Sequence, residues 1–427
     1  MRRLIVILVV SLAAASTRAK DDHDTSSIDG MQGIRIWCGD RWEHDHVYTF
    51  VDQRGFDFLR LPWDTESPID VFVAADRLNE FKSGLDENRI RYQVIVQNMS
   101  EHLENEVAVQ RMARRNRFGG EIFATFPRYD EMQDYLRKLA ETRGDIVKYF
   151  TIGRSYEGRD IGAVKISSGG ENKPAVFIDA GIHAREWVAP TTALYAVKQL
   201  VENATNHHLF EKVDVYVVPS LNPDGYEYTH QTKKSRMWRK TRSVNPNSSC
   251  LGVDANRNFE YKWMTIGASS DPCSDIYAGS EPFSEPETAA LRDFFLANKG
   301  IKIYLSFHSY GQYLLHPWGW TSSLPSNEPI LRAVAEKAEA ALSKVRGTRY
   351  MIGSSTNVLY SAAGGSDDWA QARGGVELAY TIELPSAAFG FAPPPKEIVP
   401  IGMETFEAIK VFIQYAEAGE SFESTLS

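Results

Sequence analysis

Two histidines and one glutamate stand directly after apolar segments in distant parts of the chain. His183 and Glu186 follow an apolar run over residues 175–182, and His308 follows a second one over residues 301–307. Two imidazoles and a carboxylate are the ligand set of a catalytic zinc that keeps one position open for water. Side chains placed just past strand ends converge in the crevice where open α/β sheets bind substrates. The pattern therefore predicts metal-assisted hydrolysis, although a His-x-x-Glu spacing alone also arises by chance.

Two further carboxylates could assist such a centre. Glu383 follows a third apolar run, residues 377–382, and is a candidate for taking a proton from water during hydrolysis. The alternative for Glu383 is a strand-end glutamate that faces solvent. Asp254 is the candidate partner for the second ring nitrogen of a ligand histidine, because that nitrogen needs an acceptor that fixes the tautomer.

Arginines that could bind negative charge occur in two segments. The string over residues 236–242 contains Arg236 and Arg239, and Arg257 follows Asn256 directly. A hydrolase needs a positive group for the oxyanion that develops in the transition state. A guanidinium also binds a carboxylate through two parallel hydrogen bonds. The Asn256-Arg257 pair is therefore a candidate site for a substrate carboxylate.

The segments that must position these residues alternate between helix and strand. From about residue 126 onward, helical spacing alternates with short β-rich runs, which predicts an α/β sheet with helices on both faces. The expected helices cover residues 129–142, 285–298, 327–345 and 402–415, and a further strand covers residues 212–218.

A smaller α+β unit precedes this domain. Its expected strands are residues 47–51, 69–73 and 92–96, and its expected helices are residues 76–84 and 100–115. A basic run from Arg111 to Arg117 and a glycine pair then follow. A basic run is often the solvated end of a helix, but between two compact units it favours a linker that proteases cut. We therefore divide the chain into a signal peptide (1–19), an N-terminal unit with its linker (20–117) and a large domain (118–427).

Composition and cysteine content limit the class of protein. The net charge of −9 argues against a nucleic-acid surface. The first 19 residues have the basic start, apolar stretch and small residues of a secretory signal, and no later segment has the length of a membrane span. Of the three cysteines, Cys250 and Cys273 share a polar, turn-rich segment and are expected to form a disulfide, which leaves Cys38 free or paired with another chain.

Seven strings of residues, spread over most of the chain, resemble one family, the secreted zinc carboxypeptidases of the digestive (pancreatic) type, in particular insect-like procarboxypeptidases. They are residues 152–159, 183–187, 222–225, 237–243, 254–258, 308–310 and 364–369. The resemblance implies a mixed twisted sheet with helices on both faces, preceded by an inhibitory pro-domain. It also implies an enzyme that acts on peptide or protein C-termini, is activated by a trypsin-like protease and is a monomer.

The resemblance assigns roles to individual residues. It implies one zinc ion on His183, Glu186 and His308, with Glu383 as general base. Arg239 would polarise the scissile carbonyl, Asn256 and Arg257 would hold the terminal carboxylate, and Tyr360 would cover the site. The remaining positions lie along the substrate path or match the family's disulfide: Arg185, Arg236 and Tyr310, and Cys250 with Cys273.

Asp367 falls where the family's B-type enzymes carry an aspartate that pairs with lysine or arginine. A buried, unpaired aspartate is costly, so such a pocket should accept cationic side chains and reject apolar ones. The alternatives are that Asp367 turns away, with Asp368 or neither acid in the pocket, and an A-type preference for apolar ends. Two other readings are an acylase-type amidohydrolase and a non-catalytic homologue, although all four metal and base positions are present.

Overall fold

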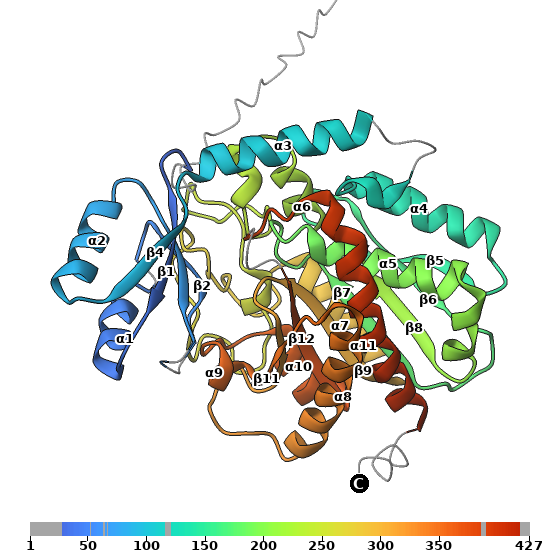
Figure 1. Ribbon diagram of the computed structural model, residues 1–427. Coiled ribbons are helices and arrows are strands. Elements are labelled where there is room, and N and C mark those ends of the chain that lie inside the picture. The colour runs from blue at the N-terminus through green and yellow to red at the C-terminus, as the bar shows by residue number, and fades with distance from the viewer. Residues whose placement is uncertain are drawn as a thin grey trace, which may run out of the picture.

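The computed structural model describes residues 28–418, except residues 52, 63, 64, 66, 116–120 and 386–389 (Figure 1). The predicted signal peptide and part of the predicted linker lie outside the described residues. No helix within the described part of the chain is long and apolar enough to cross a membrane.

The N-terminal unit contains a four-stranded antiparallel sheet in the order β2-β3-β1-β4. Its elements are β1 (Gln32–Trp37), α1 (Arg41–Tyr48), β2 (Phe56–Arg60), β3 (Ile69–Val73), α2 (Leu78–Glu87), β4 (Arg91–Val96) and α3 (Met99–Arg115). Figure 1 shows α1 and α2 on the side of this sheet that faces away from the large domain, while α3 extends along the surface of the large domain. The unit therefore touches the large domain through both its sheet and α3.

The strand predicted over residues 47–51 is wrong. Residues 41–48 form helix α1, and residues 49–51 form the turn that follows it. The carboxylate of Asp40 accepts a hydrogen bond from the backbone amide of Glu43 at 2.9 Å and so caps the first turn of the helix. His44 and Val47, three residues apart, point into the core. The alternation of residues 47–51 was therefore misleading, and strands β1 and β2 were not anticipated.

The large domain is built on an eight-stranded mixed sheet in the order β11-β10-β12-β9-β7-β8-β6-β5. Its four central strands, β12, β9, β7 and β8, are parallel to one another. The strands are β5 (Val147–Arg154), β6 (Asp160–Ile166), β7 (Ala175–Ala180), β8 (Asp214–Val218), β9 (Ile301–Ser309), β10 (Tyr313–His316), β11 (Met351–Ser354) and β12 (Leu378–Leu384). This confirms the predicted fold class and the strands expected over residues 175–182, 212–218, 301–307 and 377–382.

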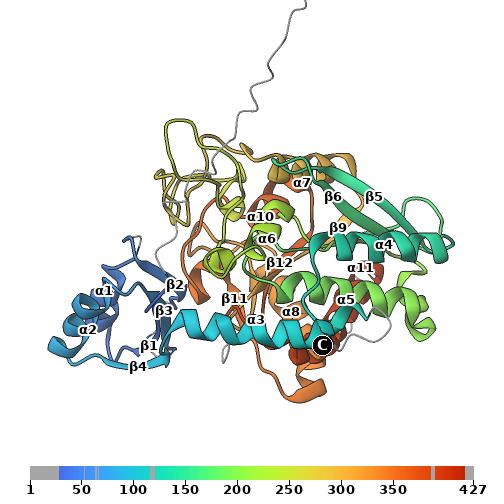
Figure 2. The ribbon, with the colours of Figure 1, turned by 90° about the horizontal axis from the view of Figure 1, so that it is seen from above.

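Helices cover both faces of this sheet (Figure 2). They are α4 (Tyr129–Thr142), α5 (Val188–Glu202), α6 (Pro223–Thr229), α7 (Pro286–Ala297), α8 (Glu328–Arg346), α9 (Ser355–Val358), α10 (Ser366–Trp369) and α11 (Ile398–Ala418). The four helices predicted for this domain are confirmed as α4, α7, α8 and α11, although α11 begins earlier than expected. Helices α4, α5, α8 and α11 pack on one face, and α7 and α10 pack on the other.

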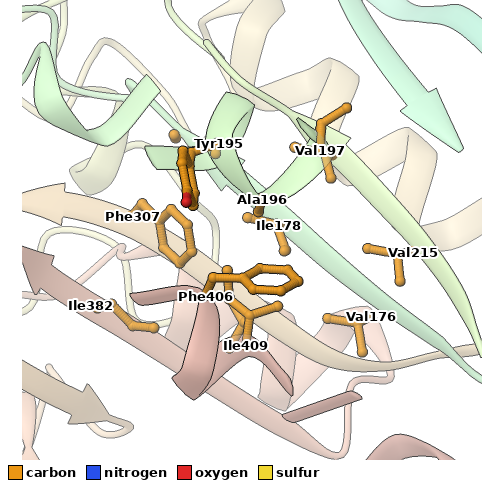
Figure 3. Packing of buried hydrophobic residues seen from close by; sticks show 14 of the residues in the cluster. Val176, Ile178, Tyr195, Ala196, Val197, Val215, Phe307, Ile382, Phe406 and Ile409 are labelled. Atoms are coloured by element: carbon orange, nitrogen blue, oxygen red, sulfur yellow. The ribbon is translucent and has the colours of Figure 1, made fainter. Parts of the chain in front are cut away.

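Alternate residues of the central strands pack on opposite faces, as the period of a strand requires. Figure 3 shows Ile178, Phe307 and Ile382 on the face that packs against Phe406 and Ile409 of α11. Within each strand, the residues that directly precede and follow these three must therefore point to the other face, toward α7 and α10. That second face carries the polar side chains of the candidate site.

Candidate metal centre

Strand register brings the candidate residues together at the carboxyl ends of β7, β9 and β12. His308 on β9 lies directly beside Glu383 on β12 in the parallel ladder. His183 follows the end of β7, and Glu186 lies just before helix α5 begins at Val188. The end of β7 therefore places His183, the start of α5 places Glu186, and the neighbouring strand β9 supplies His308.

The three predicted ligands form a buried cluster. The ligand atoms of His183, Glu186 and His308 lie within 4.8 Å of one another. The Nδ1 atom of His183 is 2.8 Å from Oε1 of Glu186 and 3.2 Å from Nδ1 of His308. All three side chains are at most 5% exposed. Two imidazole nitrogens and a carboxylate that converge in this way are suited to hold a zinc ion.

The second ring nitrogen of His183 meets Asp254, as the sequence suggested. Nε2 of His183 is 3.2 Å from Oδ1 of Asp254, which is fully buried. A carboxylate only accepts hydrogen bonds, so this contact requires the proton on Nε2 and leaves Nδ1 with a free lone pair. Burial, together with the charge of Arg239, lowers the pKa of His183 and favours the neutral imidazole that binds metal.

Glu383 is the carboxylate that remains beside this cluster. Burial and the nearby charge of Glu186 raise its pKa to about 8, against the opposing effect of His308. A carboxylate whose proton affinity lies near neutral pH can accept a proton from water and later release it. Glu383 lines the same cavity as the three ligands.

Positive groups also line the cavity. Arg239 donates from Nε and Nη2 to Oδ2 of Asp254 at 3.1 and 2.9 Å. Arg257 donates from Nε to the carbonyl oxygen of Gly267 at 2.8 Å, and Asn256 beside it accepts from the amide of Ser366 at 2.9 Å. Both arginines are therefore held by the protein with guanidinium groups at the cavity.

Asp367 lines this cavity, and Asp368 does not. Asp368 accepts hydrogen bonds from the backbone amides of Gly319 and Trp320, at 2.9 to 3.2 Å, and so is committed to that loop. Asp367 is 5% exposed, and burial raises its pKa. Of the two acids, Asp367 is the one that a bound side chain could reach. Gly319 and Ser355 line the same cavity.

The N-terminal unit closes the cavity. Phe58 and Leu59 of β2 line it directly, and the remaining space is about 70 Å³, enough for a few water molecules. Tyr310 packs with Phe391 and residues of the N-terminal unit, and Tyr360 packs against the core of that unit. The predicted lid residue is therefore held by the N-terminal unit in this form of the protein.

Two acids of the N-terminal unit form ion pairs with arginines that the sequence analysis placed along the substrate path. Asp57 accepts from Nη2 of Arg185 at 3.0 Å. Glu106 of α3 accepts from Nε and Nη2 of Arg236 at 2.8 and 2.9 Å, and both side chains are 3% exposed. Sequence reasoning missed Asp57 and Glu106, because neither stands in a motif.

Arg236 is a predicted site residue that does not line this cavity, and its role along the substrate path stays a prediction. It lies outside the cavity that holds the three ligands, since its guanidinium stacks on Trp187 at 3.6 Å and bonds the backbone carbonyls of Arg185 and Phe391. These contacts, added to the Glu106 pair, turn the side chain toward α3. The other predicted site residues, apart from Asp254 behind His183, line the cavity.

The disulfide prediction is confirmed. Cys250 and Cys273 are bonded, with their Cα atoms 5.1 Å apart. Cys38 is free and buried in the core of the N-terminal unit, where burial raises its thiol pKa to about 12. A thiol with so high a pKa is inert at neutral pH.

Comparison with known proteins matches both parts of the chain to family models. Residues 132–408 match the zinc carboxypeptidase model, and residues 42–106 match the carboxypeptidase activation peptide. The chain belongs to the zinc carboxypeptidase family. It is therefore a zinc-dependent hydrolase made as a zymogen, and the resemblance noted from the sequence is confirmed.

Relatives of both specificity types are similar to this zinc carboxypeptidase. Carboxypeptidase B of Astacus astacus is 49% identical over 293 residues, 68% of this chain and 96% of that protein. Carboxypeptidase A1 of Bos taurus is 36% identical over 421 residues, 96% of this chain and 98% of that protein. The crystal structure of carboxypeptidase A from Helicoverpa armigera superposes with a TM-score of 0.85 at 31% identity, covering 92% of this chain and 99% of that one.

Proposed function

We propose that this zinc carboxypeptidase is a secreted enzyme of B-type specificity that removes C-terminal lysine or arginine. The observation that carries the proposal is the position of Asp367, a buried acid on the wall of the cavity that contains the metal ligands. A lysine or arginine side chain would form a charge-assisted hydrogen bond with it. A phenylalanine or leucine side chain would leave this carboxylate desolvated and unpaired.

The catalytic roles follow from the geometry of the cavity. A zinc ion on His183, Glu186 and His308 would supply Lewis-acid polarisation and ease the loss of a proton from water. Glu383 would take that proton, because it lies directly beside His308 and lines the cavity with the three ligands. It would then return the proton to the amine that leaves. Arg239 would donate hydrogen bonds to the carbonyl oxygen as negative charge develops there.

The substrate's terminal carboxylate would bind Asn256 and Arg257. Both side chains line the cavity, and Arg257 is fixed by its bond to the carbonyl of Gly267. Tyr360 would close over the bound substrate once the activation peptide no longer packs against it. Because Asn256 and Arg257 would bind a free terminal carboxylate, this pair favours an exopeptidase over an acylase-type amidohydrolase.

Latency and activation complete the proposal. The activation peptide (residues 42–106 in the family match) would block substrates through Phe58 and Leu59 and would pair Asp57 with Arg185. A trypsin-like protease would cut between Arg114 and Arg117, where α3 ends at Arg115. The enzyme would be secreted and act as a monomer.

The specificity proposal is tested with a series of peptides that end in Lys, Arg, Phe or Leu, cleaved by the activated enzyme. We expect kcat/KM to favour the basic ends by roughly tenfold to a hundredfold or more, from about 1.5–3 kcal/mol for a charge-assisted hydrogen bond. Asp367→Ile should reverse the preference, and Asp367→Asn, which keeps the shape, should abolish it without favouring apolar ends.

Two results would contradict the proposal. A wild-type preference for Phe or Leu would establish the A-type alternative and show that Asp367 does not contact the substrate side chain. Failure of the zinc-loaded, activated enzyme to cleave any peptide of the series would favour a non-catalytic homologue.

A further inference from the structure

A carboxylate lies fully buried beneath the metal centre, on the face of the sheet that packs toward α7 and α10. Asp179 of β7 is 0% exposed and stands directly beside Ser306 of β9 in the parallel ladder. Its Oδ1 atom accepts a hydrogen bond from Ser306 at 2.7 Å, and its Oδ2 atom accepts one from Tyr304 at 2.6 Å. None of the catalytic roles proposed above uses this acid.

Burying a carboxylate costs free energy unless it is paired with a positive charge and hydrogen-bonded. No lysine or arginine among the described residues forms an ion pair with Asp179, whose bonding partners are two hydroxyl groups. A hydrophobic residue would fill this place in the sheet at lower cost. The position of Asp179 therefore points to a role that it exerts through its hydrogen bond with Ser306.

Ser306 connects Asp179 to the histidine of β9. Its Oγ atom is 3.2 Å from Nε2 of His308 and 2.7 Å from Oδ1 of Asp179. Ser306 and His308 are two residues apart on one strand, so their side chains lie on the same face. The three side chains thus form one continuous chain of hydrogen bonds that ends at the imidazole.

Counting protons fixes the direction of this chain. An ionised carboxylate only accepts, so the single hydroxyl proton of Ser306 must go to Asp179. The Oγ atom can then only accept from His308, which requires the ring proton to sit on Nε2. In the neutral ring that metal binding requires, the lone pair of His308 is then left on Nδ1, the atom that lies 3.2 Å from Nδ1 of His183.

We propose that Asp179 and Ser306 are positioning residues that lock His308 in the metal-binding tautomer and orientation and thereby raise the affinity for zinc. The inference rests on the proposed function of His308 as a ligand. Asp254 fixes the tautomer of His183 through a direct hydrogen bond, whereas Asp179 acts on His308 through the hydroxyl group of Ser306. Partners of this kind commonly contribute tenfold to a hundredfold in metal affinity, on the order of 1–3 kcal/mol.

The test measures zinc affinity of the activated enzyme without reference to catalysis. Metal-free Ser306→Ala and Asp179→Asn proteins are titrated with zinc at pH 8 against a chromophoric chelator. Each should bind zinc roughly tenfold to a hundredfold more weakly than wild type. The double variant should be little worse than either single one, because the two residues act through the same hydrogen-bonded chain.

A matched control separates this effect from general damage to the sheet. Ser354→Ala removes another buried serine hydroxyl, on β11, whose Oγ atom has no hydrogen-bond partner among the described residues. This variant should keep the zinc affinity of wild type. In histidine-labelled protein, ¹⁵N NMR should show a slowly exchanging Nε2 proton on His308 that becomes fast-exchanging in Ser306→Ala.

The outcomes distinguish the inference from the function on which it rests. If Ser306→Ala binds zinc as tightly as Ser354→Ala, and its Nε2 proton exchanges as in wild type, the inference is overturned. If His308→Ala binds zinc as tightly as wild type, the ligand assignment fails instead. Weaker binding in both the Ser306 and Asp179 variants, with Ser354→Ala unchanged, supports the relay.

Discussion

Replacing Glu106 by glutamine should loosen the hold of the activation peptide on the enzyme. Glu106 makes two hydrogen bonds of 2.8 and 2.9 Å with Arg236, and both side chains are 3% exposed. Removing one partner of a buried ion pair costs about 3–5 kcal/mol, because the other charge remains buried. Arg236 keeps its bonds to the carbonyls of Arg185 and Phe391, so we expect the lower end of this range. At about 1.4 kcal/mol per factor of ten, the peptide should bind roughly a hundredfold more weakly.

The assay uses zymogen that has been cut completely in the linker, so that the activation peptide is held by contacts alone. Peptidase activity is measured as the cut protein is diluted, and the concentration at half activity gives the dissociation constant. Glu104→Gln is the matched control on the same helix, because the pair of Glu104 with Lys233 is largely exposed, at 64% and 30%. Such a pair contributes at most about 1 kcal/mol, or fivefold. Equal weakening by both substitutions would refute the argument from burial.

Three further predictions concern the catalytic domain. Chelation should abolish activity and zinc should restore it, whereas His308→Ala should stay nearly inactive in excess zinc; full activity of metal-free His308→Ala would contradict the ligand assignment. Glu383→Gln should lower kcat by roughly a hundredfold to ten-thousandfold, and a change confined to KM would make Glu383 a binding residue instead. Burial raises the pKa of Glu287 to about 8, above the 4.5 of an exposed glutamate. The stability that the protonated side chain contributes is therefore complete below pH 4.5, and it declines as the pH rises toward 8. Glu287→Gln should therefore gain stability relative to wild type over that interval, by at most about 1.4 kcal/mol per pH unit in denaturant titrations, and a constant difference would contradict the shifted pKa.

The sequence predicted the large domain well because its central strands are buried on both faces. Such strands appear as short, continuous apolar runs, and they alternate here with long amphipathic helices. The N-terminal unit was predicted less well, since residues 47–51 alternate like a strand but follow a helix cap at Asp40. That cap is a local side-chain contact, and it outweighs a five-residue pattern.

The metal ligands were predictable for a related reason. His183 and Glu186 lie in the connection between β7 and α5, and His308 lies near the carboxyl end of β9. Parallel strands bring their carboxyl ends to one edge of the sheet. Asp179 was not predictable, because an acid inside an apolar run carries no signal of its purpose. Its relation to His308 depends on the register that sets Asp179 beside Ser306, and register between distant strands cannot be read from either strand alone.

The contacts between the activation peptide and the large domain were the hardest feature to predict from the sequence. Helix α3 carries Glu104 and Glu106, and at 3.6 residues per turn their side chains point about 200° apart around its axis. Only the docking of α3 on the large domain decides that Glu106 meets Arg236 in a buried contact while Glu104 meets Lys233 near solvent. The same docking places Phe58 of β2 in the cavity. Since an interface depends on two surfaces at once, these residues reach their positions only when both parts of the chain are folded.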